Sequence, residues 1–191
     1  MIISQRPVKN FTVGRGGNSP IGICLHIMEG TMAGSHNWFN NPQSRASYHY
    51  GVSRNGEIWQ FVKEENAAWS QGRVNQPTAK MVLDRPGINP NRYLISIGHE
   101  GFSTDIWTGN MKQASALLIQ DVCRRNNISI NRANIIGHYE ISIGRPNCPA
   151  VDKIIIEEMV QRAKSLGWIK QQLEIIKQKL LRLFELIKGR N

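Results

Sequence analysis

Two histidines and one cysteine are the residues of this sequence best suited to chemistry. His138 and Cys148 lie ten residues apart in a segment, 136–148, that is rich in glycine, proline and asparagine. An imidazole and a thiolate at this spacing can bind one ion if the loop folds back. His26 is the candidate third ligand, because it ends an apolar run, 21–26, that is typical of a buried strand. A tetrahedral zinc ion held by three protein ligands keeps one position open for water, as catalytic zinc sites do.

The composition describes a basic globular chain. Its 191 residues suffice for one compact domain plus an appendage, and the hydrophobic content of 40% is ordinary. No apolar run approaches the roughly 18 residues of a membrane span, so none is expected. A net charge of +10 predicts attraction to polyanions such as nucleic acid, an anionic membrane or an acidic wall polymer. The absence of zinc-finger spacing, RNP-type aromatic motifs and dense basic blocks argues against nucleic acid.

The N-terminus and the cysteines bear on the compartment. Residues 1–7 lack a basic segment followed by an apolar one, so we expect no secretory signal peptide. If the protein acts outside the cytoplasm, something else must release it. Three cysteines argue against a disulfide framework. Cys123 fits a buried position in a helix, and Cys24 would share a strand face with His26, as a core residue or as a metal neighbour.

Local patterns predict the elements that position these residues. We expect an entry arm over 1–20, a short helix at 36–40 with Ser35 as its N-cap, and a hairpin whose turn is 54–57. The long irregular stretch 63–90 is expected to border a cleft. Further along, the pattern predicts the elements strand 93–100, helix 111–127, strand 132–136 and helix 151–166, the last ended by Gly167. Interleaved strands and helices predict an α/β fold with a mixed β-sheet flanked by helices.

The composition changes near residue 168. We therefore divide the chain into a compact domain, 1–166, and a cationic amphipathic C-terminal helix, 167–191. A heptad seam comprises Ile169, Leu173, Ile176, Leu180, Leu183 and Ile187. Three partners of the 168–190 helix stay open at this point: its own domain, a second copy in a short coiled coil, or an anionic membrane or wall polymer.

Several segments together resemble a known family. In the order and spacing of zinc-dependent N-acetylmuramoyl-L-alanine amidases of type 2, the chain contains 25–27, 46–52, 55–62, 68–69, 96–100, 137–138 and 147–149. The resemblance covers about residues 20 to 165. This family is related to peptidoglycan recognition proteins and to amidase-type phage lysozymes. It implies a mixed sheet with helices around it, a zinc site in a surface cleft, and cleavage of the amide between N-acetylmuramic acid and L-alanine.

The resemblance also implies roles for single residues. His26, His138 and Cys148 match the Zn²⁺ ligands, and many relatives have aspartate in place of Cys148. Glu100 matches the glutamate taken as general base, and Tyr48 matches a tyrosine near the bound water or oxyanion. From the residues alone, Glu100 could instead be a solvated edge residue, and Tyr48 a packing residue. Zinc-activated water with a carboxylate to move its proton is chemistry suited to amide hydrolysis.

Two positions depart from the family pattern. Pro146 stands where relatives carry a lysine that stabilises the oxyanion, so Arg145 or Tyr48 would have to substitute, or the metal alone would do so. Ser70 replaces a histidine that often follows Ala-Trp, which puts one wall contact in doubt. Trp69, in the long loop, is the tryptophan best placed to stack on a sugar ring.

The remaining histidines are expected to have supporting roles. His49 and His99 should point to the strand faces opposite the catalytic candidates, and His36 should lie at a surface or cleft. The expected function is a peptidoglycan hydrolase, of the kind found as phage or prophage endolysins, that lyses bacterial cell walls. Two alternatives are a non-catalytic peptidoglycan-binding module and a zinc amidase acting on another amide. Non-catalytic relatives generally lose a metal ligand, whereas this chain has all three.

Overall fold

The computed structural model describes the backbone of residues 1–188 and the side chains of 1–167 and 172–181. Its centre is a six-stranded sheet in the order β1-β5-β4-β7-β3-β8. These strands are β1 (Ile3–Gln5), β3 (Gly22–Ile27), β4 (Tyr50–Val52), β5 (Ile58–Gln60), β7 (Leu94–His99) and β8 (Ile135–Gly137). All neighbours are parallel except β4 and β5, which form the antiparallel hairpin predicted around 54–57. The predicted mixed α/β sheet is confirmed.

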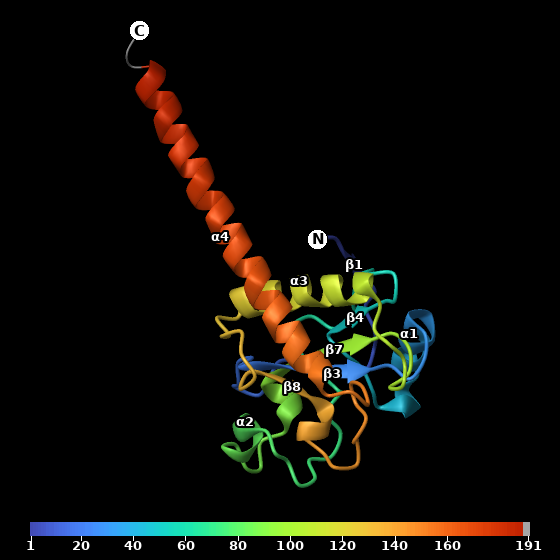
Figure 1. The fold of residues 1–191 in the computed structure, drawn as a ribbon. Helices are drawn as coiled ribbons and strands as arrows, with labels where there is room; N and C mark the ends of the chain where they lie inside the picture. Colours follow the sequence, from blue (N-terminus) through green and yellow to red (C-terminus); the bar gives the residue numbers. More distant parts are fainter. Residues whose placement is uncertain (189–191) are drawn as a thin grey trace.

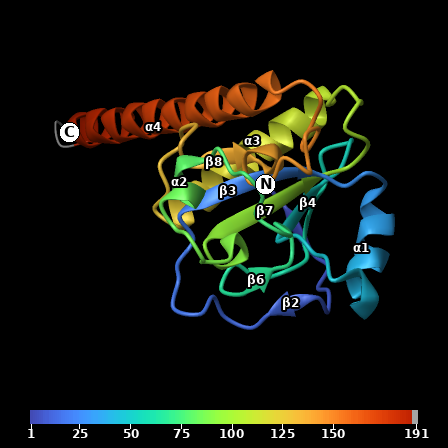
Figure 2. The same ribbon diagram turned by 90° about the horizontal axis from the view of Figure 1, so that it is seen from below.

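The central strands β3 and β7 are buried along their whole length. Their alternating side chains serve two layers, because successive residues of a strand point to opposite faces. Ile23 and Leu25 pack in one core cluster with α3 (Gly109–Arg125) and the first turns of α4 (Ile154–Lys188), whereas Cys24 packs in a second cluster with residues of α2 (Lys80–Leu83). Figure 2 shows α3 and α4 together on one side of the sheet. His26, in phase with Cys24, therefore points away from that pair of helices.

The face opposite α3 and α4 carries smaller elements. A two-stranded antiparallel ribbon pairs β2 (Phe11–Thr12) with β6 (Ala67–Ala68), and α1 (Met32–Asn40) lies beside it (Figure 2). Single 3-10 turns occupy Pro42–Ser44, Pro90–Arg92 and His138–Glu140. The stretch 63–90 is thus less irregular than predicted, since it contains β6 and α2. The strand β6 forms by pairing with β2, and α2 forms where Met81 and Val82 pack against residues of the central sheet.

The start of α1 differs from the prediction. Its N-cap is Thr31, whose side-chain oxygen accepts a hydrogen bond from Gly34 N at 3.0 Å, so the helix begins at Met32 and Ser35 lies inside it. Threonine and serine are both good N-caps, and the sequence offers each of them ahead of the same apolar residues. The choice follows from tertiary packing, because the helix from Met32 buries Met32, Ser35 and Phe39.

The C-terminal helix also differs from the prediction. Instead of ending at Gly167, α4 continues without interruption from Ile154 to Lys188. Gly167 lies where α4 crosses α3: a Cβ added there would be 3.1 Å from Gln120 Nε2, so the glycine permits close packing rather than ending the helix. The division of the chain at 166/167 stays a prediction. Figure 1 shows the outer half of α4 projecting beyond the domain.

The described part of this outer half contacts no core. Residues 173–181 are exposed, with Leu173 at 60%, Ile176 at 52% and Leu180 at 60%. Packing of the helix on its own domain is therefore wrong for these residues. The other predicted seam residues, Ile169, Leu183 and Ile187, lie outside the described side chains. No helix among the described residues combines the length and apolarity needed to cross a membrane.

Candidate metal centre

Parallel pairing of β3 with β8 brings the two histidines together. Leu25 pairs with Gly137, so His26 near the end of β3 lies beside His138, the first residue after β8. The carboxyl ends of parallel strands share one edge of a sheet, which places both imidazoles there. The ring centroids are 4.6 Å apart. Residues more than 100 positions apart in the sequence thus meet at one strand edge.

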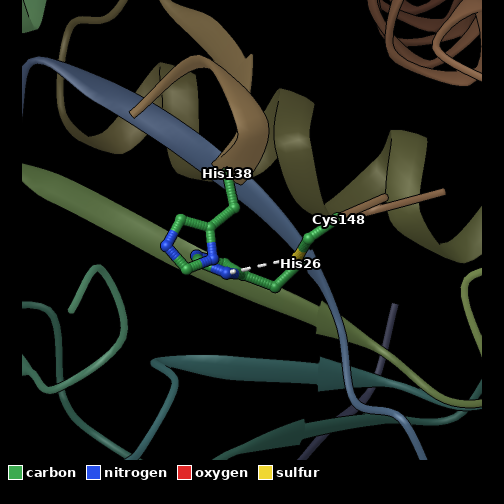
Figure 3. Close-up of side chains that lie close together, drawn as sticks. All are labelled: His26, His138 and Cys148. Carbon is green, nitrogen blue, oxygen red and sulfur yellow. Dashed lines mark hydrogen bonds between the residues drawn. The ribbon is translucent and has the colours of Figure 1, made fainter. Parts of the chain in front are cut away.

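The loop after the 3-10 turn of residues 138–140 folds back and brings Cys148 to the same point. Cys148 Sγ lies 3.9 Å from His26 Nδ1 (Figure 3), and the ligand atoms of all three residues lie within 4.8 Å of one another. Zinc with bonds of about 2.0–2.3 Å in a tetrahedron would separate sulfur and nitrogen by about 3.5 Å. The 3.9 Å pair would therefore have to close by about 0.4 Å, and a pair at the 4.8 Å limit by about 1.3 Å. Side-chain movements of this size would let the cluster hold a metal ion.

Hydrogen bonds orient the three side chains. His138 Nε2 donates to the carbonyl of Gln71 at 3.0 Å, which leaves Nδ1 of that ring for a cation. Ile27 N donates to Cys148 Sγ at 3.4 Å, a contact that favours a thiolate. His26 is fully buried, and its Nε2 has no hydrogen-bond partner among the described residues. The three side chains thus have few hydrogen-bond partners among the described residues, as expected where ring nitrogens and the sulfur are to bind an ion.

Burial sets the protonation of the cluster. Desolvation lowers the pKa of His138 to about 4 and that of His26 well below its usual value, the latter with help from the neighbouring His138. Both imidazoles are therefore neutral at pH 7, the form that binds a cation. Burial raises the pKa of the Cys148 thiol to about 11, opposed by the Ile27 amide and by Arg145. A bound divalent cation would favour the thiolate, because its positive charge stabilises the deprotonated sulfur.

The cluster borders a cleft of about 330 Å³. Predicted site residues Tyr48, Trp69 and Arg145 line this cleft together with His138 and Cys148. The two positions that depart from the family pattern, Ser70 and Pro146, line it as well. Trp69 Nε1 donates to Thr12 Oγ1 at 2.8 Å, which ties the indole to β2 and holds its ring at the cleft.

Tyr48 packs directly on a candidate ligand. Its ring stacks on that of His26 with centroids 4.8 Å apart, and its hydroxyl donates to Ile27 O at 3.2 Å. Burial raises the pKa of Tyr48 above its usual value, so its hydroxyl stays protonated. Gly98 makes room for the ring, because a Cβ at that position would lie 2.3 Å from Tyr48 Cδ2. The placement suits either catalysis or packing, the two roles considered for Tyr48.

Glu100 is placed differently from the other candidates. Its Oε1 accepts from Met32 N at 3.0 Å and its Oε2 accepts from Arg54 N at 2.9 Å, so it joins the start of α1 to the β4–β5 turn. Glu100 is not among the residues that line the cleft. A carboxylate oxygen has two lone pairs, so each can accept one more hydrogen bond. Its role as a base stays a prediction.

The supporting histidines have structural partners. His99 Nδ1 lies 2.9 Å from His26 O and Nε2 lies 2.9 Å from Ser115 Oγ of α3, while its ring stacks on Trp107 at 3.8 Å. His49 Nδ1 accepts from Ser96 N at 3.0 Å. Both are fully buried, and burial lowers the pKa of each to about 3. The expectation that both are structural agrees with these contacts.

A second cavity, of about 770 Å³, adjoins the cleft and reveals a residue that the sequence analysis missed. The two cavities share Ala46, Trp69, Ser70, His138 and Arg145. Arg45 lines the second cavity with Arg145, and no Asp or Glu does. Neither guanidinium has an ion-pair partner among the described residues. No motif singles out Arg45; only its position after the 3-10 turn Pro42–Ser44, with φ of 47°, directs it here.

The structure also places the two remaining cysteines and His36. Cys24 and Cys123 are buried core residues, and the three cysteines are free thiols. His36 lies on α1 with its ring 6.1 Å from that of Phe61, centroid to centroid. Of the two alternatives for Cys24, the structure therefore supports the core residue and not a member of the metal cluster. Within the described part of the chain, only His26, His138 and Cys148 lie close enough together to share a metal ion.

Comparison with known proteins gives concordant matches. The family model described as N-acetylmuramoyl-L-alanine amidase matches residues 16–151. N-acetylmuramoyl-L-alanine amidase A of Achromobacter lyticus is 32% identical over 126 residues, which are 64% of this chain and 62% of that protein. The match thus spans less than two thirds of this relative.

Solved structures share the fold at low sequence identity. A crystal structure of AmpD matches with a TM-score of 0.66 and 20% identity, covering 82% of this chain and 93% of that chain. The catalytic domain of XlyA matches at 0.60 and 21%, covering 85% and 99%. The Staphylococcus aureus hydrolase AmiA, in complex with its ligand, matches at 0.65 and 13%, covering 89% and 86%.

Proposed function

The chain belongs to the family of N-acetylmuramoyl-L-alanine amidases, and on this basis we propose that it hydrolyses the amide between N-acetylmuramic acid and L-alanine in peptidoglycan. The observation that carries the proposal is the convergence of His26, His138 and Cys148 beside an open cleft. Cleavage of this bond would free the stem peptide from the glycan strand and lyse the cell wall.

Zinc is the ion that we propose for the cluster. Two neutral imidazoles and one thiolate are a donor set that zinc accepts, with a fourth position left for solvent or substrate. When bound, zinc would supply an activated water and would polarise the amide carbonyl. His26, His138 and Cys148 would hold it, with His138 fixed in orientation by the Gln71 carbonyl.

The surrounding residues would bind and orient the substrate. We propose that Trp69 supports a sugar ring, since its indole is held at the cleft, and that Arg145 meets a carbonyl or carboxylate oxygen of the substrate. Tyr48 would offer its protonated hydroxyl near the reacting carbonyl after releasing Ile27 O. Relatives carry a lysine at the position of Pro146, and Arg145 is the cationic residue next to that position. We therefore propose that Arg145 stabilises the oxyanion in place of the lysine.

Glu100 is the proposed proton acceptor, and its test must separate this role from its structural one. Glu100→Gln keeps an oxygen for one backbone amide and removes the base, whereas Glu100→Ala removes both. If Glu100 is the base, both variants should keep their zinc and lose most turnover. If Glu100→Gln instead turns over substrate as fast as the parent chain, and Glu100→Ala is only less stable, the role of Glu100 is to join α1 to the hairpin.

Metal dependence and product identity test the function as a whole. A chelator should abolish hydrolysis of purified peptidoglycan, and added zinc should restore it. The products should contain new N-terminal alanine in proportion to digestion. Full hydrolysis after thorough chelation would refute the metal site, and binding of peptidoglycan without new amines would support the non-catalytic module. Release of amines other than N-terminal alanine would support an amidase for another bond.

The wider biological role is part of the same proposal. The chain would act as an endolysin that stays in the host cytoplasm until it reaches the wall, with peptidoglycan as its partner. Expression inside a bacterium, with and without a membrane pore, would test this by the timing of lysis. The alternatives for the 168–190 helix, self-association or contact with an anionic membrane or wall polymer, do not bear on hydrolysis itself.

A further inference from the structure

The outer half of α4 presents an apolar stripe to solvent. Leu173, Ile176 and Leu180 follow the spacing of one helix face and are 60%, 52% and 60% exposed. Leu181 and Ile175 are also exposed. Figure 1 shows this part of the helix clear of the domain, in contrast to the inner turns, which bury Ile156, Met159, Val160 and Ala163. Water covers apolar side chains here that a folded chain would normally bury.

Lysines border the stripe on both sides. With Leu173 and Leu180 at position a of a heptad and Ile176 at position d, Lys177 takes position e and Lys179 takes position g. Glu174 takes position b, away from the stripe. Over residues 167–191 the sequence carries six lysines or arginines against two glutamates, a net charge of +4. The apolar face is therefore framed by positive charge.

This charge pattern does not fit a second copy of the same helix. Specific coiled-coil pairing places opposite charges at e and g. Here the positions beside the described stripe hold Gln172, Lys177 and Lys179, none of them acidic. Antiparallel pairing would oppose lysine to lysine, and parallel pairing would oppose lysine to an uncharged residue. Self-association would thus bury the apolar stripe at an electrostatic cost or without electrostatic gain.

A hydrophilic polyanion fits only half of the surface. It would meet the lysines but leave the apolar stripe in water. An anionic bilayer offers both parts, because its headgroups attract lysine and the boundary below them accepts apolar side chains. Lysine stems can lie along the apolar layer while their ammonium groups reach the phosphates.

We propose that the outer half of α4 docks on an anionic phospholipid membrane, with Leu173, Ile176 and Leu180 facing the lipid and Lys177 and Lys179 at the headgroups. The helix lies in the plane of the surface. The proposal is independent of the chemistry of the metal centre, because it concerns a different surface. Of the three partners that the sequence leaves open for the 168–190 helix, it selects the anionic membrane.

Docking in this way leaves the cleft free. The inner turns of α4 pack on the sheet face formed by Ile23 and Leu25, whereas His26 points to the other face. Figure 2 shows α4 along one side of the domain, opposite the β2–β6 ribbon. A bilayer beneath the helix would therefore hold the domain at the membrane without covering the site.

Co-sedimentation of the full chain with vesicles tests the proposal. Vesicles of phosphatidylcholine mixed with phosphatidylglycerol should bind the protein, and vesicles of phosphatidylcholine alone should bind it far less. Lys177→Gln with Lys179→Gln should weaken binding about 30-fold, at about 1 kcal/mol for each lysine. Leu173→Gln with Ile176→Gln and Leu180→Gln should abolish it. Glutamine is a good helix former, so circular dichroism should show unchanged helicity.

A matched control and four contrary outcomes make the test decisive. Gln178→Ala lies at position f, on the side of the helix opposite the stripe, and should bind as the parent chain does. Equal binding to neutral vesicles, or undiminished binding of the triple glutamine variant, would overturn the proposal. So would light scattering that shows a dimer lost in the triple variant, or stripe-dependent binding to soluble polyphosphate in place of vesicles.

The outcome can be read separately from the proposed function. Hydrolysis of a soluble muropeptide should be the same for the parent chain and for all these helix variants. Loss of vesicle binding with normal hydrolysis would fail only the membrane proposal, and vesicle binding without hydrolysis would fail only the amidase.

Discussion

A methyl group on Gly98 would occupy space that the Tyr48 ring already fills. Gly98 lies on β7 directly across from His26 on β3, and Tyr48 stacks on the His26 ring. The Cβ of an alanine at this position would lie 2.3 Å from Tyr48 Cδ2 and 2.6 Å from Cε2. Carbon atoms in contact are normally about 3.5–4.0 Å apart, so the ring would have to shift by about 1 Å or more.

That shift has a calculable cost. Forcing an extra methyl group into a packed region typically costs about 1–3 kcal/mol. For a chain of this length, each kcal/mol lowers the midpoint of thermal unfolding by about 2–4 °C, so Gly98→Ala should lower it by about 2–12 °C. Tyr48 also contacts His26, and its displacement should weaken metal binding in the same variant.

Thermal unfolding followed by circular dichroism measures the cost, and a double-mutant cycle assigns it. With Tyr48→Ala in the background the ring is absent, so adding Gly98→Ala should cost under about 1 kcal/mol. Gly109→Ala is the matched control, because its Cβ would meet nothing within 4 Å. Parent-like stability of Gly98→Ala, or an equal cost in both backgrounds, would refute the packing argument.

Three further changes test other parts of the molecule. Cys148→Ser should lower zinc affinity by more than the roughly 10–100-fold that follows loss of a hydrogen-bond partner of a ligand, and elemental analysis should find the variant without zinc. Cys148→Asp should retain zinc, because carboxylates also bind this ion. Arg45→Ala or Arg145→Ala should raise KM about 10- to 100-fold for a stem peptide with free carboxylates, and less for its amidated form; equal effects on both substrates would contradict an anion-binding cavity. Glu64 is held by Arg125, Asn126 and Tyr50, whose hydrogen bonds outweigh burial and lower its pKa. Its stabilisation should be full above about pH 4.3 and be lost as the pH falls further, so the stability advantage over Glu64→Gln should shrink there; an advantage that is constant with pH would exclude ionisation as its source.

Turn chemistry and apolar periodicity predicted much of the framework. The Asn55-Gly56 hairpin, the two long buried strands and helix α3 depend on local signals, namely turn chemistry and apolar spacing, and each lies close to its expected position. The end of α4 was missed because glycine is ambiguous: in the sequence Gly167 resembles a helix stop, but the close approach of Gln120 gives it a packing reason. Local signals cannot show what crosses the helix from another part of the chain.

The sequence by itself determined which residues can bind a metal. His26, His138 and Cys148 are recognisable by type and by the strand and loop patterns around them, because donor chemistry is a property of the side chain. Their meeting point was decided by the pairing of β3 with β8 and by the return of the loop to Cys148, which no local pattern encodes.

Tertiary structure alone decided the roles of several other groups. It brought Arg45 to a cavity beside Arg145, directed the Gln71 carbonyl to His138, and gave both Glu100 oxygens a backbone amide. These arrangements join segments that are distant in sequence, and a backbone carbonyl carries no signature in the residue type at all. Contacts of this kind depend on the packing of the whole chain, which is why they become visible only in the folded molecule.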